Sequence, residues 1–585
     1  MSAISKPLYQ VAQQLVDVAM GREGADTIIT NGRVVNVCSG EIHAGFVIAI
    51  KAGRVAFLGP AEELAEGARR GAREIDAEDM YLVPGFLDAH EHIESSLMRP
   101  REFAKAVIPH GTTTVFYDSH EIGNVLGDTG IRWMQRDLDR TLLKGYSTYP
   151  SCVPATAEQF ETSGARIGPE EVAEAMTWPE TIALGEMMNY PGVIFNDPKV
   201  HGEIAATLQA EKVVEGHSHS LLGKELNAFA AAGITSCHES ITKQDCLERV
   251  RAGLYTYLRQ GSGWPDVKDT VRAVTEAGID SRRICLCTDD RHAGDLVEAG
   301  HVDEAVRMAI VSGVRPVEAI QMVTLNPVTH YRLDHEVGSI TPGRLADIVF
   351  LSDLPQVRVE RVMIEGIFFD EWKEEAAPVD TSPVTDTVHI GHKLTPEDFT
   401  LASEGTLHVI GLRNEDVRTD HLAFEVEPGE VEADPSQDLL KCAVIERHTT
   451  SGRIGLGMVK GFGIREGAYA STVGHDAHNL IVIGTNDEDM ATAANRLAEI
   501  SGGLIVVVNG QTRALLELPI AGLMSEESAE TVAQKVRQIE ETLWSLGATL
   551  NHPFMNFSLV PLAVIESLRL TDRGLIDTEK FELIT

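Results

Sequence analysis

The sequence has few cysteines, no long apolar run and comparatively little positive charge. Its seven cysteines among 585 residues are an odd number without the spacing of a disulfide scaffold, which indicates a reducing, cytoplasmic environment. No segment approaches the ~18 apolar residues of a membrane span, and the first 20 residues predict an amphipathic helix, not a signal peptide. The sequence has 50 basic and 88 acidic residues, which gives a net charge of −38. We therefore expect neither nucleic acid nor a membrane as a partner.

Several catalytic motifs are also missing. The sequence has no G-x-x-x-x-G-K-[ST] phosphate loop, no G-x-S-x-G elbow and no P-C-x-x-C segment to accompany an H-x-E. These absences exclude P-loop nucleotide hydrolases, serine hydrolases of the α/β type and the zinc deaminases that act on cytosine or on adenine in tRNA.

The length and the strand-and-turn patterns predict several domains. Short strands with turn signals fill residues 1–83 after the amphipathic helix, and a similar texture returns at 335–373. We expect these two stretches to form one small split β-sandwich around an inserted domain, residues 84–334. Residues 374–585 are predicted to be a linker followed by an α/β or α+β domain.

The inserted domain alternates short apolar segments with helical patterns. Eight such units over about 250 residues predict an α/β fold of the (β/α)8 TIM-barrel type. The eight strand-like segments are 83–92, 112–121, 145–154, 181–189, 212–219, 233–240, 253–260 and 283–290.

Polar side chains follow the apolar part of most of these segments. In a (β/α)8 barrel the chemistry lies at the carboxyl ends of the strands. His90 and His92 are separated by one residue, so in a strand both imidazoles can face the same point. The other residues at strand ends are Asp118, His120, Glu186, His217, His219, His238, Glu239, Asp289 and Asp290.

This set of imidazoles and carboxylates predicts a divalent metal centre. Zinc, manganese and iron all accept such ligands, and the oxygen-rich set favours manganese or iron over zinc. The two oxygens of Glu186 can bridge two ions. A bound ion lowers the pKa of water to about 7 and so supplies hydroxide for hydrolysis. Asp289 can ligate an ion, accept the proton of the attacking water and deliver it to the leaving group.

Each of these residues also has a purely structural interpretation. His217 and His238 can each be hydrogen-bonded core histidines, Glu186 can cap a helix, and Asp289 with Asp290 can open the following helix. Caps and core packing do not explain why ligand-type residues stand at five separate strand ends. The joint placement therefore favours the metal centre.

Longer blocks of sequence resemble a known family. "PGFLDAHEHIESS", "LGEMMNYPGV", "LNPVTHYRL" and "GSITPGRLADIVFL" are similar to the amidohydrolase superfamily. The blocks "GLGMVKGFGIREGAYASTVGHDAHNLIVIGTNDEDM" and "LPIAGLMS" in the last third resemble the bacterial adenine deaminases of that superfamily more specifically. The resemblance extends over nearly the whole chain.

That resemblance implies hydrolysis of adenine to hypoxanthine and ammonia at a binuclear manganese or iron centre, with metal-bound hydroxide attacking C6. It carries over six ligand positions: His90, His92 and Asp289 for one ion, His217 and His238 for the other, and Glu186 between them. Glu239 is implied to deliver a proton to a purine ring nitrogen, or alternatively to orient a ligand histidine. His120 is expected close to the substrate or the metals.

The sequence departs from the family pattern beside the site. Ser119 replaces a proline, His219 lies in an altered loop after the fifth strand, and Cys237 replaces an aspartate. These changes leave the ligand positions intact but bear on the substrate. The polar segment 473–479 of the last domain is expected either to reach the pocket or to lie solvated on the surface of its own domain.

Two other functions remain open at this point. A cyclic amide hydrolase or N-acetyl deacetylase would use the same metal chemistry, and a noncatalytic metal-binding scaffold would use the same ligands. A proton acceptor such as Asp289 argues against the scaffold, since a structural site closes its coordination. Large barrel enzymes are commonly symmetric, so we expect a homo-oligomer, in the simplest case a dimer.

Overall fold

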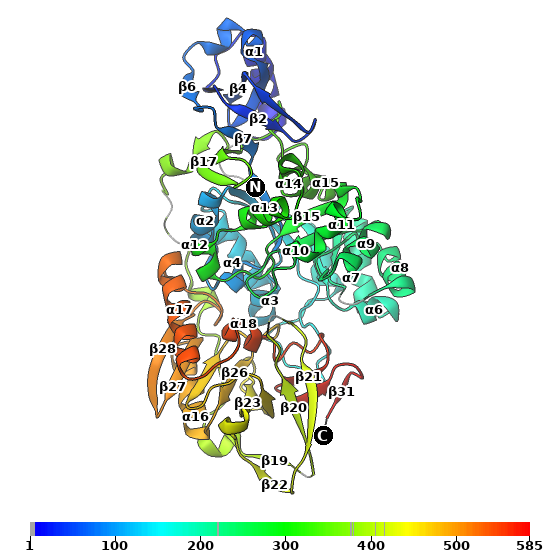
Figure 1. The fold of residues 1–585 in the computed structure, drawn as a ribbon, viewed down its shortest axis with the longest axis vertical. Helices are drawn as coiled ribbons and strands as arrows, with labels where there is room; N and C mark the ends of the chain where they lie inside the picture. The colour runs from blue at the N-terminus through cyan, green and yellow to red at the C-terminus, as the bar shows by residue number, and fades with distance from the viewer. Residues whose placement is uncertain are drawn as a thin grey trace.

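The computed structural model of the protein describes residues 6–218, 221–374, 377, 379–403, 405–414 and 416–584. Three parts follow one another along its long axis: a β-sandwich at the top of Figure 1, a barrel in the middle and the C-terminal domain at the bottom. This arrangement confirms the predicted α/β fold with a TIM-type barrel and two further units.

The central part is a barrel of parallel strands. One sheet has the order β12-β11-β10-β9-β8 and a second has the order β13-β14-β15. Glu91 forms a parallel bridge with Asp289, and the backbone N–H of Thr235 donates to the carbonyl of Val214 at 3.0 Å, so both seams between the sheets are joined. The strands are β8 Phe86–Glu91, β9 Thr112–Tyr117, β10 Lys144–Tyr149, β11 Thr181–Met187, β12 Val213–Gly216, β13 Ser236–Cys237, β14 Tyr255–Arg259 and β15 Ile284–Cys287. Seven of them lie within one of the eight predicted segments, and β10 begins one residue before the segment 145–154.

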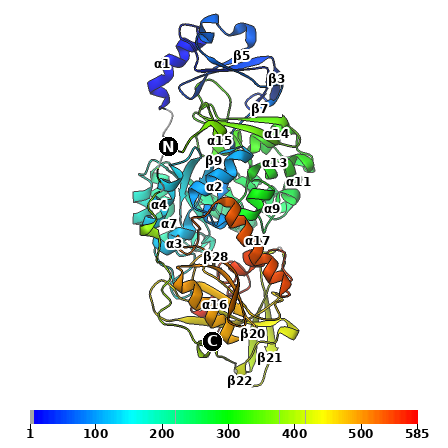
Figure 2. The same ribbon diagram turned by 90° about the vertical axis from the view of Figure 1, so that its left-hand side faces the viewer.

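Helices surround the barrel, as Figure 2 shows for α2, α4 and α13. No described helix has the length and apolar character needed to cross a membrane. The barrel helices are α2 Pro100–Val107, α3 His120–Leu126, α4 Asp128–Leu138, α5 Pro169–Ala175, α6 Tyr190–Ile194, α7 Pro198–Gln209, α8 Gly223–Ala231, α9 Lys243–Arg251, α10 Val267–Thr270, α11 Arg272–Thr275, α12 Ala293–Glu298, α13 Val302–Val311, α14 Pro316–Met322 and α15 Leu325–His330.

The β-sandwich combines strands from before and after the barrel. Its sheets have the orders β5-β4-β1-β6 and β18-β17-β16-β7-β2-β3. β16 runs antiparallel to β7, with Val349 opposite Val83, although the barrel lies between them in sequence. The strands are β1 Thr27–Thr30, β2 Arg33–Asn36, β3 Glu41–Ala44, β4 Phe46–Lys51, β5 Arg54–Pro60, β6 Arg73–Asp76, β7 Tyr81–Pro84, β16 Ile348–Asp353, β17 Arg358–Ile364 and β18 Ile367–Phe368. The domain boundaries 1–83, 84–334, 335–373 and 374–585 stay a prediction.

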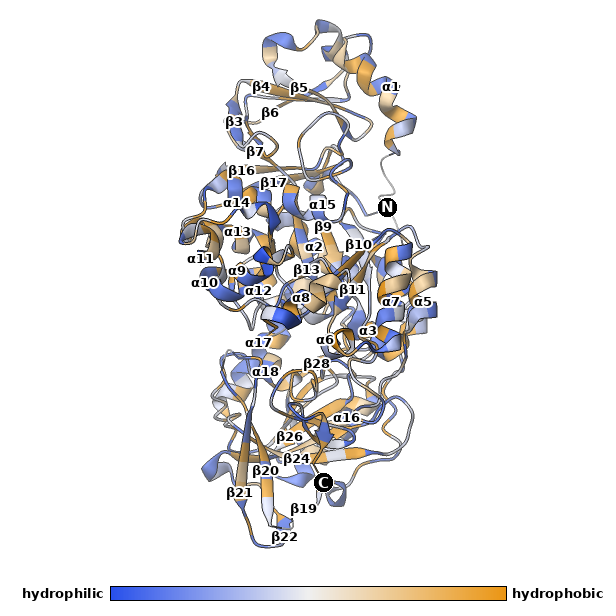
Figure 3. Cartoon of the chain, turned by 90° about the vertical axis from the view of Figure 1, so that its right-hand side faces the viewer, coloured by the Kyte–Doolittle hydropathy of each residue, from blue (hydrophilic) through white to orange (hydrophobic). Residues whose placement is uncertain are grey.

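Helix α1, Leu8–Ala19, covers part of this sandwich and confirms the predicted amphipathic helix. Val11, Leu15 and Val18 are its buried residues, spaced three or four positions apart as one helical face requires. The mixed colours of α1 in Figure 3 follow this pattern.

The C-terminal domain is α+β. Its main sheet has the order β21-β20-β24-β23-β26-β25-β27-β28 and is largely antiparallel. The strands and helices are β19 Leu401–Ser403, β20 Thr406–Gly411, β21 Asp420–Glu425, β22 Gly429–Val431, β23 Leu439–Ile445, β24 Ile454–Lys460, β25 Ala468–Ser471, β26 Leu480–Gly484, α16 Asp487–Glu499, β27 Gly503–Val508, β28 Gln511–Glu517, α17 Ala529–Ser545, α18 Pro553–Ser558, β29 Leu568–Thr571, β30 Gly574–Asp577 and β31 Glu582–Leu583.

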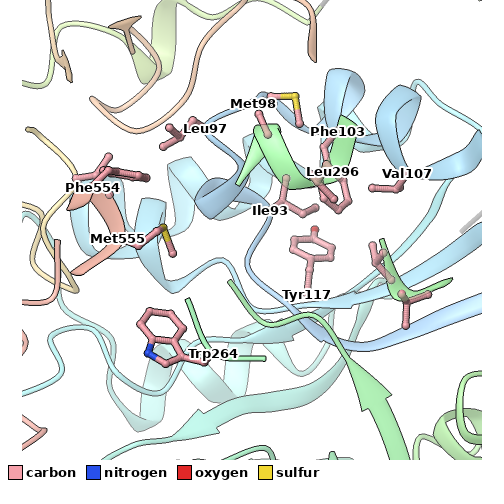
Figure 4. Packing of buried hydrophobic residues seen from close by; sticks show 14 of the residues in the cluster. Ile93, Leu97, Met98, Phe103, Val107, Tyr117, Trp264, Leu296, Phe554 and Met555 are labelled. Carbon is pink, nitrogen blue, oxygen red and sulfur yellow. The ribbon is translucent and has the colours of Figure 1, made fainter. Parts of the chain in front are cut away.

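The C-terminal domain packs on the barrel without a break in the apolar core. Phe554 and Met555 of α18 belong to the same buried cluster as Leu97, Met98 and Trp264 of the barrel, and Figure 4 shows them gathered in one region. The backbone N–H of the domain's Ser525 also donates to the carbonyl of Leu97 at 2.8 Å. The domain is thereby fixed beside the carboxyl ends of the strands.

Candidate metal centre and active site

The carboxyl ends of the barrel strands open into a cavity. Both the barrel and the C-terminal domain line it. The barrel contributes His92, His120, Glu121, Glu186, Met188, His217, His238, Glu239, Arg259, Trp264, Asp289 and Asp290, and the C-terminal domain contributes Val417, His475, Asp476, Leu559, Leu562 and Ile565.

His90 and His92 face each other at the end of β8, with 3.2 Å between their Nε2 atoms. The hydrogen bonds of their Nδ1 atoms determine which ring nitrogen carries the proton. His90 Nδ1 donates to Glu215 Oε2 at 3.1 Å, and His92 Nδ1 donates to the carbonyl of Asp118 at 3.0 Å. In the neutral rings both Nε2 atoms then carry lone pairs that point at the same place. Two facing lone pairs repel unless a cation lies between them, so this pair fits a metal ion.

Glu186, at the end of β11, turns one oxygen toward each half of the histidine cluster. Its Oε1 lies 3.3 Å from His92 Nε2. Its Oε2 lies 2.6 Å from His217 Nδ1 and 3.1 Å from His238 Nε2. The carboxylate is buried, and its two oxygens face different histidines.

Gly185 leaves room for Asp118, which helps to position the Glu186 carboxylate. A Cβ on Gly185 would stand 2.1 Å from Asp118 Oδ2, and that oxygen accepts a hydrogen bond from the backbone N–H of Glu186 at 3.0 Å. Only glycine lets Asp118, at the end of β9, come so close to β11.

His120 lies beside the same carboxylate, with its Nδ1 3.5 Å from Glu186 Oε1. Within the described part of the chain, His120 Nδ1 and Asp118 Oδ1 are buried without a hydrogen-bond partner. Buried polar atoms of this kind are costly unless an ion, water or ligand meets them. The donor set and these two atoms therefore fit the implied metals.

Asp289 and Glu239 are joined by an arginine that the sequence analysis did not single out. Arg259, the last residue of β14, donates from Nη1 to Asp289 Oδ2 at 3.0 Å and makes an ion pair with Glu239 Oε1. Asp289 Oδ1 faces the other way, 3.2 Å from His92 Nε2. Asp289 has a left-handed backbone with φ of 61°, an arrangement that functional sites hold at a cost.

The structure brings together all the predicted site residues that it describes. His90, His92, Glu186, His217, His238 and Asp289 form the cluster, with His120 and Glu239 at its edge. His219 lies outside the described residues. Arg259 is the next-to-last residue of the predicted segment 253–260, where polar strand-end residues are expected, so the same pattern also indicates Arg259. Tyr331 lies outside the predicted strand segments, and its hydrogen bond to Glu215 depends on the fold, so no sequence pattern indicates this pair.

The segment 473–479 reaches the cavity, and this resolves the alternative left open by the sequence. His475 Nδ1 donates to Glu121 Oε1 at 2.8 Å. Burial alone would lower the pKa of His475, but the charge and hydrogen bond of Glu121 raise it to about 9. His478 accepts from the backbone N–H of Gly474 at its Nδ1, so its Nε2 carries the proton and donates to Glu121. These hydrogen bonds join the C-terminal domain to the barrel.

Comparisons with known proteins agree with this geometry. Residues 81–368 match the model of the amidohydrolase family, and residues 417–582 match the adenine deaminase C-terminal domain. Curated adenine deaminases from Clostridium botulinum (strain ATCC 19397 / Type A) and Moorella thermoacetica are 44% and 45% identical, each over 99% of this chain and 98% of the relative. One from Ruegeria sp. (strain TM1040) is 46% identical over 98% of this chain and 97% of the relative. The chain belongs to the adenine deaminase family.

The similarity to the adenine deaminase family extends to the C-terminal domain. The matched region 417–582 contains every residue that this domain places in the cavity, from Val417 to Ile565. The second match therefore falls on part of the site itself.

Proposed function

We propose that this protein is an enzyme that hydrolyses adenine to hypoxanthine and ammonia with the help of two divalent metal ions. The observation that carries the proposal is the convergence of four histidines on the two oxygens of Glu186, with Asp289 beside His92, in a chain 44–46% identical to curated adenine deaminases along its whole length. The reaction class suits a set of ligands that stays open toward a cavity.

The proposed ligands fall into two groups that share Glu186: His90, His92 and Asp289 on one side, His217 and His238 on the other. Manganese or iron suits this mixture of carboxylate and imidazole better than zinc. When bound, such an ion supplies hydroxide near neutral pH, since it lowers the pKa of water from about 15.7 to about 7.

The chain's own residues then move two protons. Adenine gains one oxygen at C6 and one proton on the ring nitrogen N1, while the amino group leaves with the other proton as ammonia. Asp289 reaches the ligand cluster through Oδ1 and is suited to carry a proton to the leaving amine. Glu239, paired with Arg259, is suited to accept the other proton from the attacking water and hand it to N1.

Arg259 has a positioning role in this scheme. Its Nη1 contacts both carboxylates at once, so it holds them at a fixed separation from each other. Because the guanidinium stays charged, it also stabilises whichever of the two carboxylates is ionised at a given step.

A cytoplasmic location and a homodimer belong to the same proposal. The location rests on the seven cysteines. The dimer rests on the symmetry common among large barrel enzymes.

Conversion of adenine by the purified protein tests the proposal. The protein is loaded anaerobically with manganese, and loss of adenine is followed by ultraviolet absorbance together with direct ammonia detection. We expect equal amounts of hypoxanthine and ammonia, and no turnover after chelation. Hydrolysis of a cyclic amide or an N-acetyl group without ammonia release from adenine would contradict the proposal.

A further inference from the structure

One carboxylate in the cavity has no part in the reaction described so far. Asp476, from the C-terminal domain, is buried, and within the described residues its Oδ2 has no hydrogen-bond partner. Its Oδ1 lies 3.8 Å from His120 Nε2 and 3.8 Å from His475 Nδ1, which is beyond hydrogen-bond distance. A buried carboxylate oxygen without a donor is costly. A bound molecule that supplies an N–H would relieve this cost.

A second buried polar group in the cavity is a hydrogen-bond donor, whereas Asp476 is an acceptor. Trp264 lines the same space, and within the described part of the chain its indole Nε1 also lacks a partner. This N–H can only donate. Besides His120 Nδ1, the described residues of the cavity therefore offer one acceptor and one donor without a partner.

Apolar side chains line the cavity beside these polar groups. Leu559, Leu562, Ile565 and Val417 come from the C-terminal domain, and Met188 faces them from the barrel. Apolar walls with a few unmatched polar groups are typical of a pocket for a flat heteroaromatic ring. The metal ligands lie on the barrel side of His120, and Asp476 lies on its other side.

We propose that Asp476 accepts a hydrogen bond from the imidazole N–H of the free purine base and so determines the specificity of the enzyme. Trp264 donates to a ring nitrogen that carries a lone pair. The inference rests on the proposed function, which places C6 and its amino group at the metal ligands and leaves the imidazole half of the ring toward the C-terminal domain. A purine alkylated on that nitrogen, as in a nucleoside, has no N–H for Asp476 and is rejected.

The test compares adenine with 7-methyladenine and 9-methyladenine in the manganese-loaded full-length protein. The wild type is expected to prefer adenine over at least one methylated base by about 1,000-fold in kcat/KM, since a site built for an N–H rejects an analogue without it. Asp476→Asn should lower kcat/KM for adenine by about 100-fold, mainly through KM. The same change should lower kcat/KM for the rejected base by less than about threefold.

Two further variants separate recognition from a structural effect. Asp476→Ala removes the acceptor and opens space. The preference for adenine should therefore fall further than in Asp476→Asn, and kcat/KM for the methylated base should rise. Trp264→Phe keeps the flat wall and removes only the donor, so KM for adenine should rise by about 10-fold. Glu488→Gln, an exposed carboxylate-to-amide change on α16 of the same domain, is the matched control and should change neither KM nor selectivity.

Equal losses for adenine and both methylated bases in Asp476→Asn would overturn the inference, because a structural role lowers every substrate alike. Calorimetric binding of adenine to the same proteins makes the comparison without turnover. Binding that depends on Asp476 but leads to no deamination would overturn the proposed function and keep the inference. Deamination of adenine by the wild type, together with unchanged binding of adenine to Asp476→Asn, would overturn the inference and keep the proposed function.

Discussion

His90 and His92 are each held by a second group that fixes the position of the ring proton. His90 donates to Glu215, which in turn accepts from Tyr331. His92 donates to a backbone carbonyl, which cannot be removed by substitution. Such partners orient a ligand and raise its basicity. At the scale of single residues, the site therefore depends on shared carboxylates whose two oxygens have different tasks.

Glu186→Gln tests the bridging carboxylate. The amide keeps the size of the side chain but offers a neutral oxygen to one half of the cluster and an N–H donor to the other, which repels a cation. We expect bound manganese to fall from about two ions per chain to one or fewer, and kcat to fall by about 1,000-fold or more. Metal analysis after gel filtration and adenine turnover measure both effects. Full metal content with full activity would contradict the bridging role.

Arg259→Met tests the link between Glu239 and Asp289. Removing one partner of a buried ion pair leaves uncompensated charge, which costs about 3–5 kcal/mol. We expect kcat for adenine to fall by about 100-fold or more while the metal content stays near that of the wild type. The pH profile of kcat should shift as well, because the two carboxylates lose their shared positive charge. Arg259→Lys retains the charge and should recover part of the loss.

At the scale of elements, the sequence predicts the strands and the ligands but not the contacts between them. Alternating apolar segments mark β8 to β15, and the residues that follow them mark the cluster. The role of Glu121 could not be predicted, because its partners His475 and His478 are about 350 positions away in sequence and meet it only through domain packing. For the same reason, the sequence left open whether the segment 473–479 reaches the pocket.

Gly185→Ala tests how closely β9 and β11 must approach. The added Cβ would stand 2.1 Å from Asp118 Oδ2, so Asp118 must move and the backbone N–H of Glu186 loses its acceptor. We expect loss of metal and at least about 100-fold lower activity, with destabilisation of about 1–3 kcal/mol. Gly168→Ala is the control, since its added Cβ would meet only Glu171 Oε2 at 3.4 Å. Wild-type activity in Gly185→Ala would show that the strands can separate without harm.

At the scale of the whole molecule, buried histidines link stability to pH. His330, at the end of α15, is 5% exposed, and its Nδ1 accepts from the hydroxyl of Tyr257 at 2.6 Å. Burial, with the charges of Arg283 and Arg332, lowers its pKa to about 3. In the unfolded chain the pKa of histidine is about 6.5. The unfolded state therefore binds the proton first as the solution becomes acidic.

The sign of the effect follows from this difference. The contribution of His330 to stability is fully present above pH ~6.5 and is lost as the pH falls toward 3, by up to about 1.4 kcal/mol per pH unit. His330→Gln removes the titrating group. We expect the variant to lose less stability than the wild type between pH 6.5 and pH 4, measured as the shift of the unfolding temperature with pH. Identical slopes for both proteins would contradict the assignment.

Metal removal should destabilise the whole barrel, because the ligands come from strands all around it. β8, β11, β12, β13 and β15 each place a candidate ligand in the cluster, so without ions the facing lone pairs of His90 and His92 are left at 3.2 Å. A ligand present at about 1,000 times its Kd stabilises the folded state by about 4 kcal/mol. For a protein of this size that corresponds to a fall of roughly 3 °C in Tm for each ion removed, or roughly 7 °C for two ions. Thermal unfolding with chelator and after re-addition of manganese measures the change, and Glu186→Gln, which is expected to bind fewer ions, should show a smaller shift. An unchanged Tm in a wild type that loses two ions per chain would mean that the cluster is as stable empty as filled, contrary to the repulsion inferred from its proton positions.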